Sequence, residues 1–412
     1  MRYFVESYGC TMNFGEGVQL SDRMAELGHE RVTCADDAEI VVLNTCIVVS
    51  ATEKKMIKRI SELRRSGKEV VVTGCMAKVQ PERIAIRLPD SLIVPPEDYP
   101  GFTDDVVSRY GRGDAETAPS DEHFGIIPIA QGCLGNCTYC ITRFARGRLA
   151  SYPAASLKTE FDRMVAAGAK EILLTAQDTA CYGRDIGGSL ADLIAELLEN
   201  EEEYRIRIGM MNPDSLDEGL DDLLEVIADD RVYRFLHIPV QSGSDDVLAA
   251  MKRKYTVNGF KGLVGRLRSR YPEISIATDV ITGFPGETDE DHRMSVELLE
   301  WLKADTVNIT RFSPRPGTPA MQMEHINGRI VAERSAEITG VKNSVESMVN
   351  SRLIGRTYRA LVTEKGKAGT SIARNENYRP IAVEEDLEPG TFIDVEVTDY
   401  ASTHLFGRRL NK

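Results

Sequence analysis

Three cysteines stand close together in the middle of the chain, in the segment QGCLGNCTYC. Cys133, Cys137 and Cys140 follow the spacing C-x3-C-x2-C. Thiolates are soft ligands, and closely spaced cysteines on one loop can hold an iron–sulfur cubane. A cubane has one more iron than this trio has thiols, so one iron would stay open. Structural zinc, which takes four protein ligands, is the alternative, but no further Cys or His lies nearby in the sequence.

Three more cysteines follow strand-like runs in the amino-terminal region. Cys10, Cys46 and Cys75 come at or just after the ends of the runs RYFVESYG, AEIVVLNTC and KEVVVTGC. Helix-like stretches around residues 18–27 and 52–66 lie between these runs, and this alternation predicts a doubly wound parallel sheet. The carboxyl ends of parallel strands meet at one edge, so we expect the three thiols to share one rim. We interpret the two remaining cysteines, Cys34 and Cys181, as a buried small residue and a bystander.

The wider pattern predicts three parts in this α/β chain of 412 residues. Residues 1–105 form the doubly wound domain, and residues from Pro89 to about His123 read as a linker rich in Pro, Asp and Gly. Residues 119–349 contain six strand signals that alternate with helix signals, which predicts a partial, open (β/α)6 barrel. Residues 350–412 carry short strand signals separated by turns, typical of a small antiparallel OB-like barrel.

Composition restricts the possible partners. The formal net charge of −14 argues against a protein that binds nucleic acid through bulk charge, so RNA contacts must come from local patches. One candidate patch lies on a helix expected at residues 52–66, although such a run is as often only a solvated face. Its basic residues, continuing just past the helix, are Lys54, Lys55, Lys58, Arg59, Arg64, Arg65 and Lys68. We find no apolar run of membrane-spanning length and no signal-peptide pattern, and therefore expect a cytoplasmic protein with no membrane partner.

The cysteine loop resembles that of radical S-adenosylmethionine (SAM) enzymes, with Tyr139 at the usual aromatic position. The resemblance implies that SAM chelates the open iron, and that its reductive cleavage yields a 5′-deoxyadenosyl radical. The segments YGCTMN, NTC and TGCMA, together with HIPVQSGSDDVLAAMKR, DVITGFPGET and RPGTPA, resemble the methylthiotransferase family. The carboxyl-terminal part resembles that family's tRNA-binding TRAM module. AQDTACYGRD and CITRFARGRLASYP resemble the archaeal and eukaryotic branch.

This resemblance implies a transferase that methylthiolates adenine C2 of N6-threonylcarbamoyladenosine at position 37, next to the tRNA anticodon. It implies two [4Fe-4S] clusters and SAM as both radical source and methyl donor. The Cys10, Cys46 and Cys75 trio would hold the second cluster. The implied partners are the tRNA anticodon stem-loop, an electron donor such as a ferredoxin or flavodoxin, and a sulfur source. Isopentenyl-adenosine in tRNA, a ribosomal-protein aspartate, or a non-catalytic zinc and RNA-binding role remain as alternatives.

Candidate contacts for SAM lie at expected strand ends, where polar groups and flexible turns gather. They are Tyr139, Gln177, Asp178, Gln241, Ser242, Gly283, Gly286 and Glu287. Three arginines follow the cysteine loop, Arg143, Arg146 and Arg148. We expect them to meet tRNA phosphates or the threonyl carboxylate, with ion pairs to the protein's own acidic residues as the alternative.

Anaerobic reconstitution with iron and sulfide tests the choice of metal. We expect a brown protein that carries about eight irons per chain, because each of two cubanes holds about four. Iron counting and the visible absorption spectrum measure this. A colourless protein that retains zinc instead would support the zinc alternative.

Overall fold

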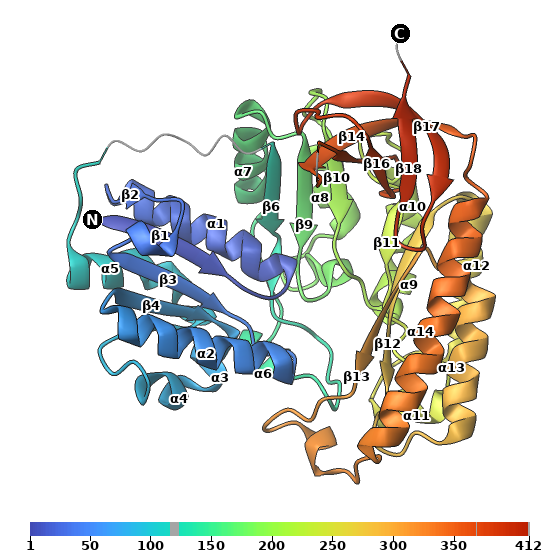
Figure 1. Cartoon of the computed structure of the whole chain (residues 1–412), viewed down its shortest axis with the longest axis horizontal. Helices are drawn as coiled ribbons and strands as arrows, with labels where there is room; N and C mark the ends of the chain where they lie inside the picture. The colour runs from blue at the N-terminus through green and yellow to red at the C-terminus, as the bar shows by residue number, and fades with distance from the viewer. Residues whose placement is uncertain (116–122, 368, 411–412) are drawn as a thin grey trace. The chain divides into compact units, whose positions relative to one another are not determined.

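The computed structural model describes residues 1–115, 123–367 and 369–410, and the chain divides into two compact units (Figure 1). Unit 1 comprises residues 1–120, 131–150 and 313–321, and unit 2 comprises residues 121–130, 151–312 and 322–412. The cysteine loop therefore belongs to the same unit as the amino-terminal segment. Within the described ranges, no helix is both long and apolar enough to cross a lipid bilayer.

Unit 1 is built on a parallel sheet with the strand order β2-β1-β3-β4-β5. Its strands are β1 (Arg2–Ser7), β2 (Glu30–Arg31), β3 (Ile40–Thr45), β4 (Glu69–Gly74) and β5 (Leu92–Val94). Its helices are α1 (Thr11–Glu26), α2 (Ser50–Ser66), α3 (Cys75–Val79), α4 (Pro81–Ala85), α5 (Phe102–Tyr110) and α6 (Thr142–Arg146), with 3-10 turns η1 (Ala35–Asp37) and η2 (Pro96–Gly101).

The two faces of this sheet carry separate cores, because successive strand residues point to opposite faces. On one face, Val41 and Val72 pack with Met56 of α2. On the other face, Val42 and Val71 pack with α1 and α5. The prediction of a doubly wound domain is confirmed.

Two local predictions for unit 1 were wrong. The expected linker instead contains β5, η2 and α5, because Phe102 and Val106, one helical turn apart, are fully buried beneath the sheet. The first helix was expected from Val18 but begins at Thr11, since its first turns bury polar residues such as Asn13 that hide the apolar pattern. Residues 116–122 of the expected linker lie outside the described residues.

Unit 2 contains two three-stranded parallel sheets, β10-β9-β6 and β11-β12-β13. Isolated bridges, Ile206 to Val232 and Met210 to His237, join β10 to the β11 segment, so the six strands form one open arc. The strands are β6 (Phe124–Pro128), β9 (Glu171–Thr175), β10 (Arg205–Ile208), β11 (Phe235–His237), β12 (Ser275–Thr282) and β13 (Thr306–Arg311), besides the two-residue strands β7 (Ala130–Gln131) and β8 (Ala150–Ser151). This arrangement confirms the predicted partial barrel.

Helices follow these strands, as a parallel sheet requires. They are α7 (Ala154–Ala166), α8 (Leu190–Leu197), α9 (Pro213–Glu218), α10 (Leu220–Val226), α11 (Asp245–Ala250), α12 (Val257–Arg270) and α13 (Asp289–Leu302), with the 3-10 turn η3 (Thr179–Cys181). The 3-10 turn η4 (Pro319–Gln322) belongs to unit 1 except for its last residue. A longer helix, α14 (Gly328–Ser351), leads to the carboxyl-terminal part.

The carboxyl-terminal part is a closed barrel with the strand order β14-β15-β16-β18-β17. Its strands are β14 (Thr357–Lys365), β15 (Ser371–Arg374), β16 (Pro380–Val383), β17 (Phe392–Tyr400) and β18 (Leu405–Arg409). Alternate residues such as Ala360, Val362 and Val395 fill its interior. The prediction of a small OB-like barrel is confirmed.

One hairpin of this barrel, the docking hairpin at residues 375–379 between β15 and β16, attaches it to the parallel strands. The Tyr378 ring lies 4.8 Å from the ring of Tyr233 and 5.0 Å from that of Phe235. Arg379 forms an ion pair with the buried Asp305, which directly precedes β13. These partners all lie at the amino-terminal ends of the parallel strands, so the barrel is fixed to that edge.

Truncating Tyr378 tests this attachment. We expect Tyr378→Ala to destabilise the protein by about 3 kcal/mol, because a large, partly buried ring that packs against Tyr233 and Phe235 is removed. Urea unfolding measures the loss, and Tyr378→Phe, which keeps the ring, is the control. Equal unfolding midpoints for Tyr378→Ala and the unmodified protein would contradict the role of the docking hairpin.

Candidate functional site

Three thiols lie at the carboxyl edge of the unit 1 sheet, as predicted. Cys10 precedes the first residue of α1, Cys46 directly follows β3, and Cys75 is the first residue of α3 after β4. The strands β1, β3 and β4 are direct neighbours. Gly9 has φ +112°, and a Cβ there would lie 2.7 Å from Cys46 Sγ, so only glycine allows this approach. The three strand ends therefore bring the thiols to one rim.

Asn13, which the sequence reasoning missed, fixes the turns that carry two of these cysteines. Its side-chain amide donates to the carbonyl oxygens of Tyr8 (2.8 Å) and Thr45 (2.9 Å). The side chain of Asn44 donates in turn to the backbone oxygen of Asn13 at 2.6 Å. The asparagines of YGCTMN and NTC thus bind the two turns together. The presence of an Asn in both cysteine motifs is the sequence feature from which this role could have been predicted.

Burial and the neighbouring thiols both raise the pKa of the buried cysteines at this rim. Burial raises the pKa of Cys46, and it raises the pKa of Cys75 to about 12. Cys10 and Cys46 also act to raise the pKa of Cys75, because a negative charge on either would repel the Cys75 thiolate. Arg146 opposes these effects at both buried thiols.

Arg146 lies inside unit 1, where its side chain is 1% exposed. It pairs with Glu16, whose side chain is 2% exposed, with Nη2 at 2.8 Å from Oε2. It also donates to Asn13 Oδ1 at 2.7 Å and to Cys75 Sγ at 3.3 Å. The structure thus supports the ion-pair alternative for Arg146 instead of a contact with RNA. Glu16 is a second residue that the sequence reasoning missed.

Cys133, Cys137 and Cys140 lie on a tight loop next to the hydrogen bonds of Arg146. The Gly135 amide donates to Cys133 Sγ at 3.1 Å, and a Cβ on Gly135 would lie 3.2 Å from Cys133 Sγ and 3.9 Å from Cys137 Sγ. Ile141 and Ala145, just after Cys140, are buried in the same core cluster as Cys75. Both trios are therefore parts of unit 1.

The RPGTPA segment supports this loop from a distant part of the chain. The Ala320 amide donates to the Thr138 carbonyl oxygen at 3.0 Å. Arg315, whose side chain is 3% exposed, pairs with Glu53 of α2 at 2.5 Å. Arg83 pairs with the other oxygen of Glu53. This explains why residues 313–321 belong to unit 1.

The donor chemistry of both trios fits iron–sulfur clusters. In the part of the chain that the structure describes, no three Cys, His, Asp or Glu side chains converge as ligands of a single metal ion. The cysteines of a cubane have a different requirement, because each binds a separate iron. Each trio supplies soft thiol donors, and Arg146 places a positive charge beside one of them.

Several predicted SAM contacts already have partners within unit 2. Asp178 is buried and accepts hydrogen bonds from the Asn212 amide (3.1 Å), the Asn212 side chain (2.8 Å) and the Ser215 hydroxyl (2.8 Å). The buried Ser242 hydroxyl accepts from the Ser244 amide at 3.2 Å. Both side chains hold loops at strand ends. Gln177 is half-buried there, and Tyr139 is half-buried in the cysteine loop of unit 1; contacts of these residues with SAM stay predictions.

Gln241 has an unusual backbone for a residue other than glycine, with φ 69°. Its amide donates to the Asp279 carbonyl oxygen at 2.8 Å, and its own carbonyl accepts from the Ile281 amide at 2.9 Å. Such left-handed residues cost of order 1–3 kcal/mol and often mark functional sites. The strain at Gln241 is consistent with its predicted place at a ligand site.

The GFPGE turn is fixed from both sides. The Glu287 carboxylate accepts from the Gly283 amide (2.8 Å) and from Arg334 of α14 (2.8 Å). Burial raises the pKa of Glu287, and these two bonds oppose that rise. Gly283 has φ +76°, and a Cβ there would lie 2.6 Å from the methyl groups of Val331. Gly286 is exposed, with φ +86°.

The other two arginines after the cysteine loop are more accessible than Arg146. Arg143 is half-buried; it donates to Asn136 Oδ1 and lies 5.1 Å from the ring centroid of Phe144. Arg148 is exposed. Their role toward RNA stays a prediction.

The sequence reasoning missed a polar group within the parallel strands of unit 2. Asp279 Oδ1 lies 2.9 Å from His237 Nε2 and accepts from Asn308 Nδ2 at 2.8 Å. Burial acts to raise the pKa of Asp279, but the bonds to His237 and Asn308 outweigh it and lower the pKa. The sequence feature that could have indicated these residues is the presence of His237 and Asp279 within otherwise apolar strands.

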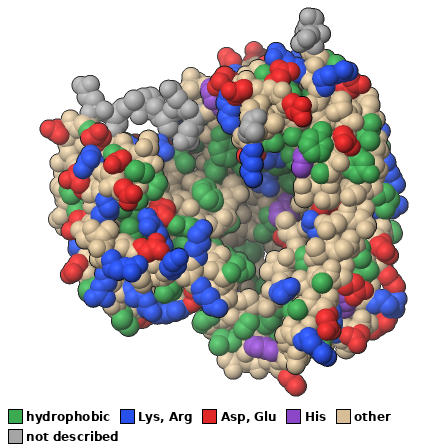
Figure 2. Space-filling view, in the orientation of Figure 1, with side chains coloured by type: hydrophobic (Ala, Val, Ile, Leu, Met, Phe, Trp, Pro, Cys, Tyr) green, Lys and Arg blue, Asp and Glu red, His purple; other side chains and the backbone are tan. Residues whose placement is uncertain are grey.

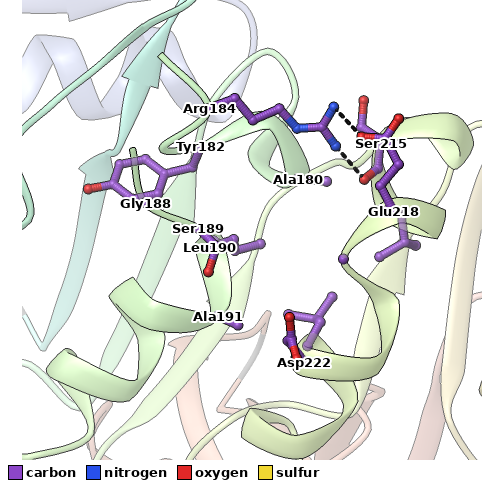
Figure 3. Close-up of a pocket in the computed structure, with 13 residues that line it drawn as sticks. Ala180, Tyr182, Arg184, Gly188, Ser189, Leu190, Ala191, Ser215, Glu218 and Asp222 are labelled. Atoms are coloured by element: carbon purple, nitrogen blue, oxygen red, sulfur yellow. Dashed lines mark hydrogen bonds and ion pairs between the residues drawn. The ribbon is translucent and has the colours of Figure 1, made fainter. Parts of the chain in front are cut away.

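A cavity of about 240 Å³ lies among η3, α8, α9 and α10 (Figure 3). At its edge Arg184 donates to the Ser215 carbonyl oxygen at 2.8 Å and pairs with Glu218 at 2.8 Å (Figure 3). No cysteine of either trio lines it. Cys181 nearby is buried against Asp178 and Ser215, as expected of a bystander. The expectation that Cys34 is buried is wrong, because it lies on the surface just before η1.

Family models match three segments of the chain. The radical SAM superfamily matches residues 127–299, an uncharacterized protein family designated UPF0004 matches residues 2–94, and the TRAM domain matches residues 351–410.

Curated relatives match almost the whole chain. A probable threonylcarbamoyladenosine tRNA methylthiotransferase of Pyrococcus abyssi is 39% identical, with 99% of each chain covered. The protein of the same name from Archaeoglobus fulgidus is 37% identical, with 99% of this chain and 98% of that protein covered. The threonylcarbamoyladenosine tRNA methylthiotransferase of Homo sapiens is 34% identical, with 99% of this chain and 74% of that protein covered.

Solved structures share the fold at low sequence identity. The radical SAM methyltransferase TsrM of Kitasatospora setae, with cobalamin and a [4Fe-4S] cluster bound, superposes with a TM-score of 0.59 at 16% identity, covering 77% of this chain and 73% of TsrM. The cobalamin-dependent radical SAM enzyme OxsB gives a TM-score of 0.54 at 14% identity, covering 84% of this chain and 56% of OxsB. This likeness concerns the fold alone.

The buried Arg146–Glu16 pair gives a test of the site. We expect Arg146→Met to destabilise the full chain by about 3–5 kcal/mol, because it leaves the Glu16 carboxylate buried without its partner. The double variant with Glu16→Leu should recover much of that loss. Urea unfolding measures both.

An exposed ion pair provides the matched control. Arg408, which pairs with Glu396, has a side chain that is 72% exposed, so Arg408→Gln should cost about 1 kcal/mol or less. If Arg146→Met costs no more than Arg408→Gln, the buried pair does not hold the cysteine loop as we describe.

Proposed function

The chain belongs to the threonylcarbamoyladenosine tRNA methylthiotransferase family of radical SAM enzymes, and we propose that it methylthiolates C2 of the adenine in N6-threonylcarbamoyladenosine beside the tRNA anticodon. The C2–H bond is neither acidic nor polar enough for a side-chain acid or base to activate at neutral pH. Radical chemistry is therefore the suitable tool, and sulfur must be supplied at the same place.

The observation that carries this proposal is the presence of two cysteine trios in one compact unit. Ile141 and Ala145 of the cysteine-loop segment share a core with Cys75, and Arg146 donates to the Cys75 sulfur. A methylthio transfer requires one site that opens the C–H bond and a second site that presents sulfur. Two thiol trios within one unit match that requirement.

We assign one [4Fe-4S] cluster to Cys133, Cys137 and Cys140 and a second to Cys10, Cys46 and Cys75. With SAM bound, the first cluster would supply the radical chemistry and the second a place for the transferred sulfur, with SAM also the source of the methyl group. The protein orients and shields the thiols. Asn13 fixes the turns of Cys10 and Cys46, Arg146 holds Cys75, and burial keeps water from Cys46 and Cys75.

The relatives and the TRAM match support tRNA as the substrate. The threonylcarbamoyl group follows from the names of the relatives, whereas isopentenyl-adenosine or a ribosomal-protein aspartate would need the same two cluster sites. The reaction also requires a one-electron donor, such as a ferredoxin or flavodoxin, and a sulfur source. A cytoplasmic location would keep the thiols reduced.

Replacing Cys133 tests the assignment. We expect Cys133→Ala to abolish formation of 2-methylthio-N6-threonylcarbamoyladenosine and to lose about half of the bound iron, since one trio is broken and the other is intact. Nucleoside mass spectrometry and iron analysis measure these effects. Cys34→Ala is the matched control, because Cys34 is exposed and belongs to neither trio.

Retained modification by Cys133→Ala would overturn the proposal. Nucleoside analysis of tRNA from a strain lacking the protein separates the substrates. Loss of a 2-methylthio isopentenyl nucleoside, with the threonylcarbamoyl derivative unchanged, would favour the first alternative.

A further inference from the structure

Helix α2 carries a row of basic residues along its exposed side. Lys54, Lys58 and Arg65 are spaced by four and seven residues, which places them on one face of a helix with 3.6 residues per turn. Met56, Ile60 and Leu63 lie on the opposite face and are buried against the sheet. We call Lys54, Lys58 and Arg65 the α2 stripe. Figure 2 shows Lys and Arg side chains gathered over this helix.

The protein itself makes little use of these three charges. Lys54 and Arg65 have no ion-pair partner among the described residues. Lys58 lies 3.8 Å from Glu62, but its side chain is 80% exposed, so this pair contributes little.

Neighbouring basic residues of the same run are used differently. Arg59 binds both oxygens of Glu6, at 3.0 and 2.9 Å from its Nε. Lys68 donates to the carbonyl oxygens of Asp36 (2.7 Å) and Ala38 (2.6 Å). The sequence run therefore separates into residues that stabilise the fold and a stripe left available to solvent.

The α2 stripe begins beside the rim that carries Cys10, Cys46 and Cys75. α2 starts four residues after Cys46, and Lys55 Nζ lies 4.7 Å from the ring centroid of Tyr8, two residues before Cys10. From Lys54 to Arg65 the helix rises by about 16 Å. The stripe thus leads away from the rim over a length that suits several consecutive phosphates of a nucleic acid.

We propose that the α2 stripe binds the sugar–phosphate backbone of the tRNA substrate, so that unit 1 grips the RNA as well as carrying the cysteine trios. The chain has 64 acidic and 50 basic residues, and an unpaired basic row on such a protein is complementary to a polyanion. This inference rests on the proposed function for the identity of the polyanion. It adds a binding surface outside the carboxyl-terminal barrel.

The test removes the three charges together. The variant Lys54→Gln, Lys58→Gln, Arg65→Gln should bind full-length tRNA about 10- to 100-fold more weakly near physiological salt. The slope of log affinity against log salt concentration should fall by about 2–3, because each phosphate contact contributes about 0.7–0.9. Fluorescence titration of the reconstituted full chain over a range of salt concentrations measures both quantities.

A matched control removes three exposed basic residues outside the α2 stripe. Arg112→Gln, Lys254→Gln and Arg270→Gln change the net charge equally, and tRNA affinity and salt slope should stay close to those of the unmodified protein. Equal iron content and unfolding midpoints show that both triple variants are folded.

Three results would overturn the inference. Unchanged affinity and slope in the stripe variant would exclude a phosphate contact. Equal losses in both triple variants would show only a bulk charge effect. Unchanged tRNA binding with slower reduction by flavodoxin would make the stripe a docking site for an acidic reductant. If tRNA carries no methylthio nucleoside made by the unmodified protein, the proposed function fails, and the binding measurement still decides the role of the stripe.

Discussion

Parallel pairing of β1, β3 and β4 is the constraint from which the site is built. Neighbouring strands lie about 4.8 Å apart, and a parallel sheet brings all carboxyl ends to one edge. Each of these three strands is followed by a turn that carries one cysteine. The turns then need only local support, which Gly9 and Asn13 provide by close approach and by hydrogen bonds across the edge.

Unit 1 contains a buried, paired basic residue and a row of exposed ones. Arg146 is taken out of water, and its cost is offset by Glu16 and by donation to Asn13 and Cys75. Because both partners are buried, this pair fixes where the helix after the cysteine loop lies. The α2 stripe is the opposite case, since its charges remain hydrated and add nothing to the packing of the helix.

The sequence patterns were sufficient for most of the fold and for the shared rim of thiols. Period-two strands and cysteine positions are local features, and parallel topology converts them into a spatial prediction. The sequence alone could not show that Arg146 points inward, because Glu16 lies 130 residues away. The convergence of His237, Asp279 and Asn308 could not be predicted either, because these residues are distant in the sequence and come from three different strands. α5 was missed because Pro, Asp and Gly around it dominate the local pattern.

The docking hairpin sets a length within unit 2. Tyr378 and Arg379 fasten the small barrel to the amino-terminal ends of the parallel strands, whereas Gln241 and the GFPGE turn lie toward the carboxyl ends. The eight residues of β12 span about 25 Å between these edges. A free nucleoside is much shorter than this interval, but a folded stem and loop is not. A ligand that contacts both the small barrel and the residues near Gln241 must therefore extend over the full length of the parallel strands.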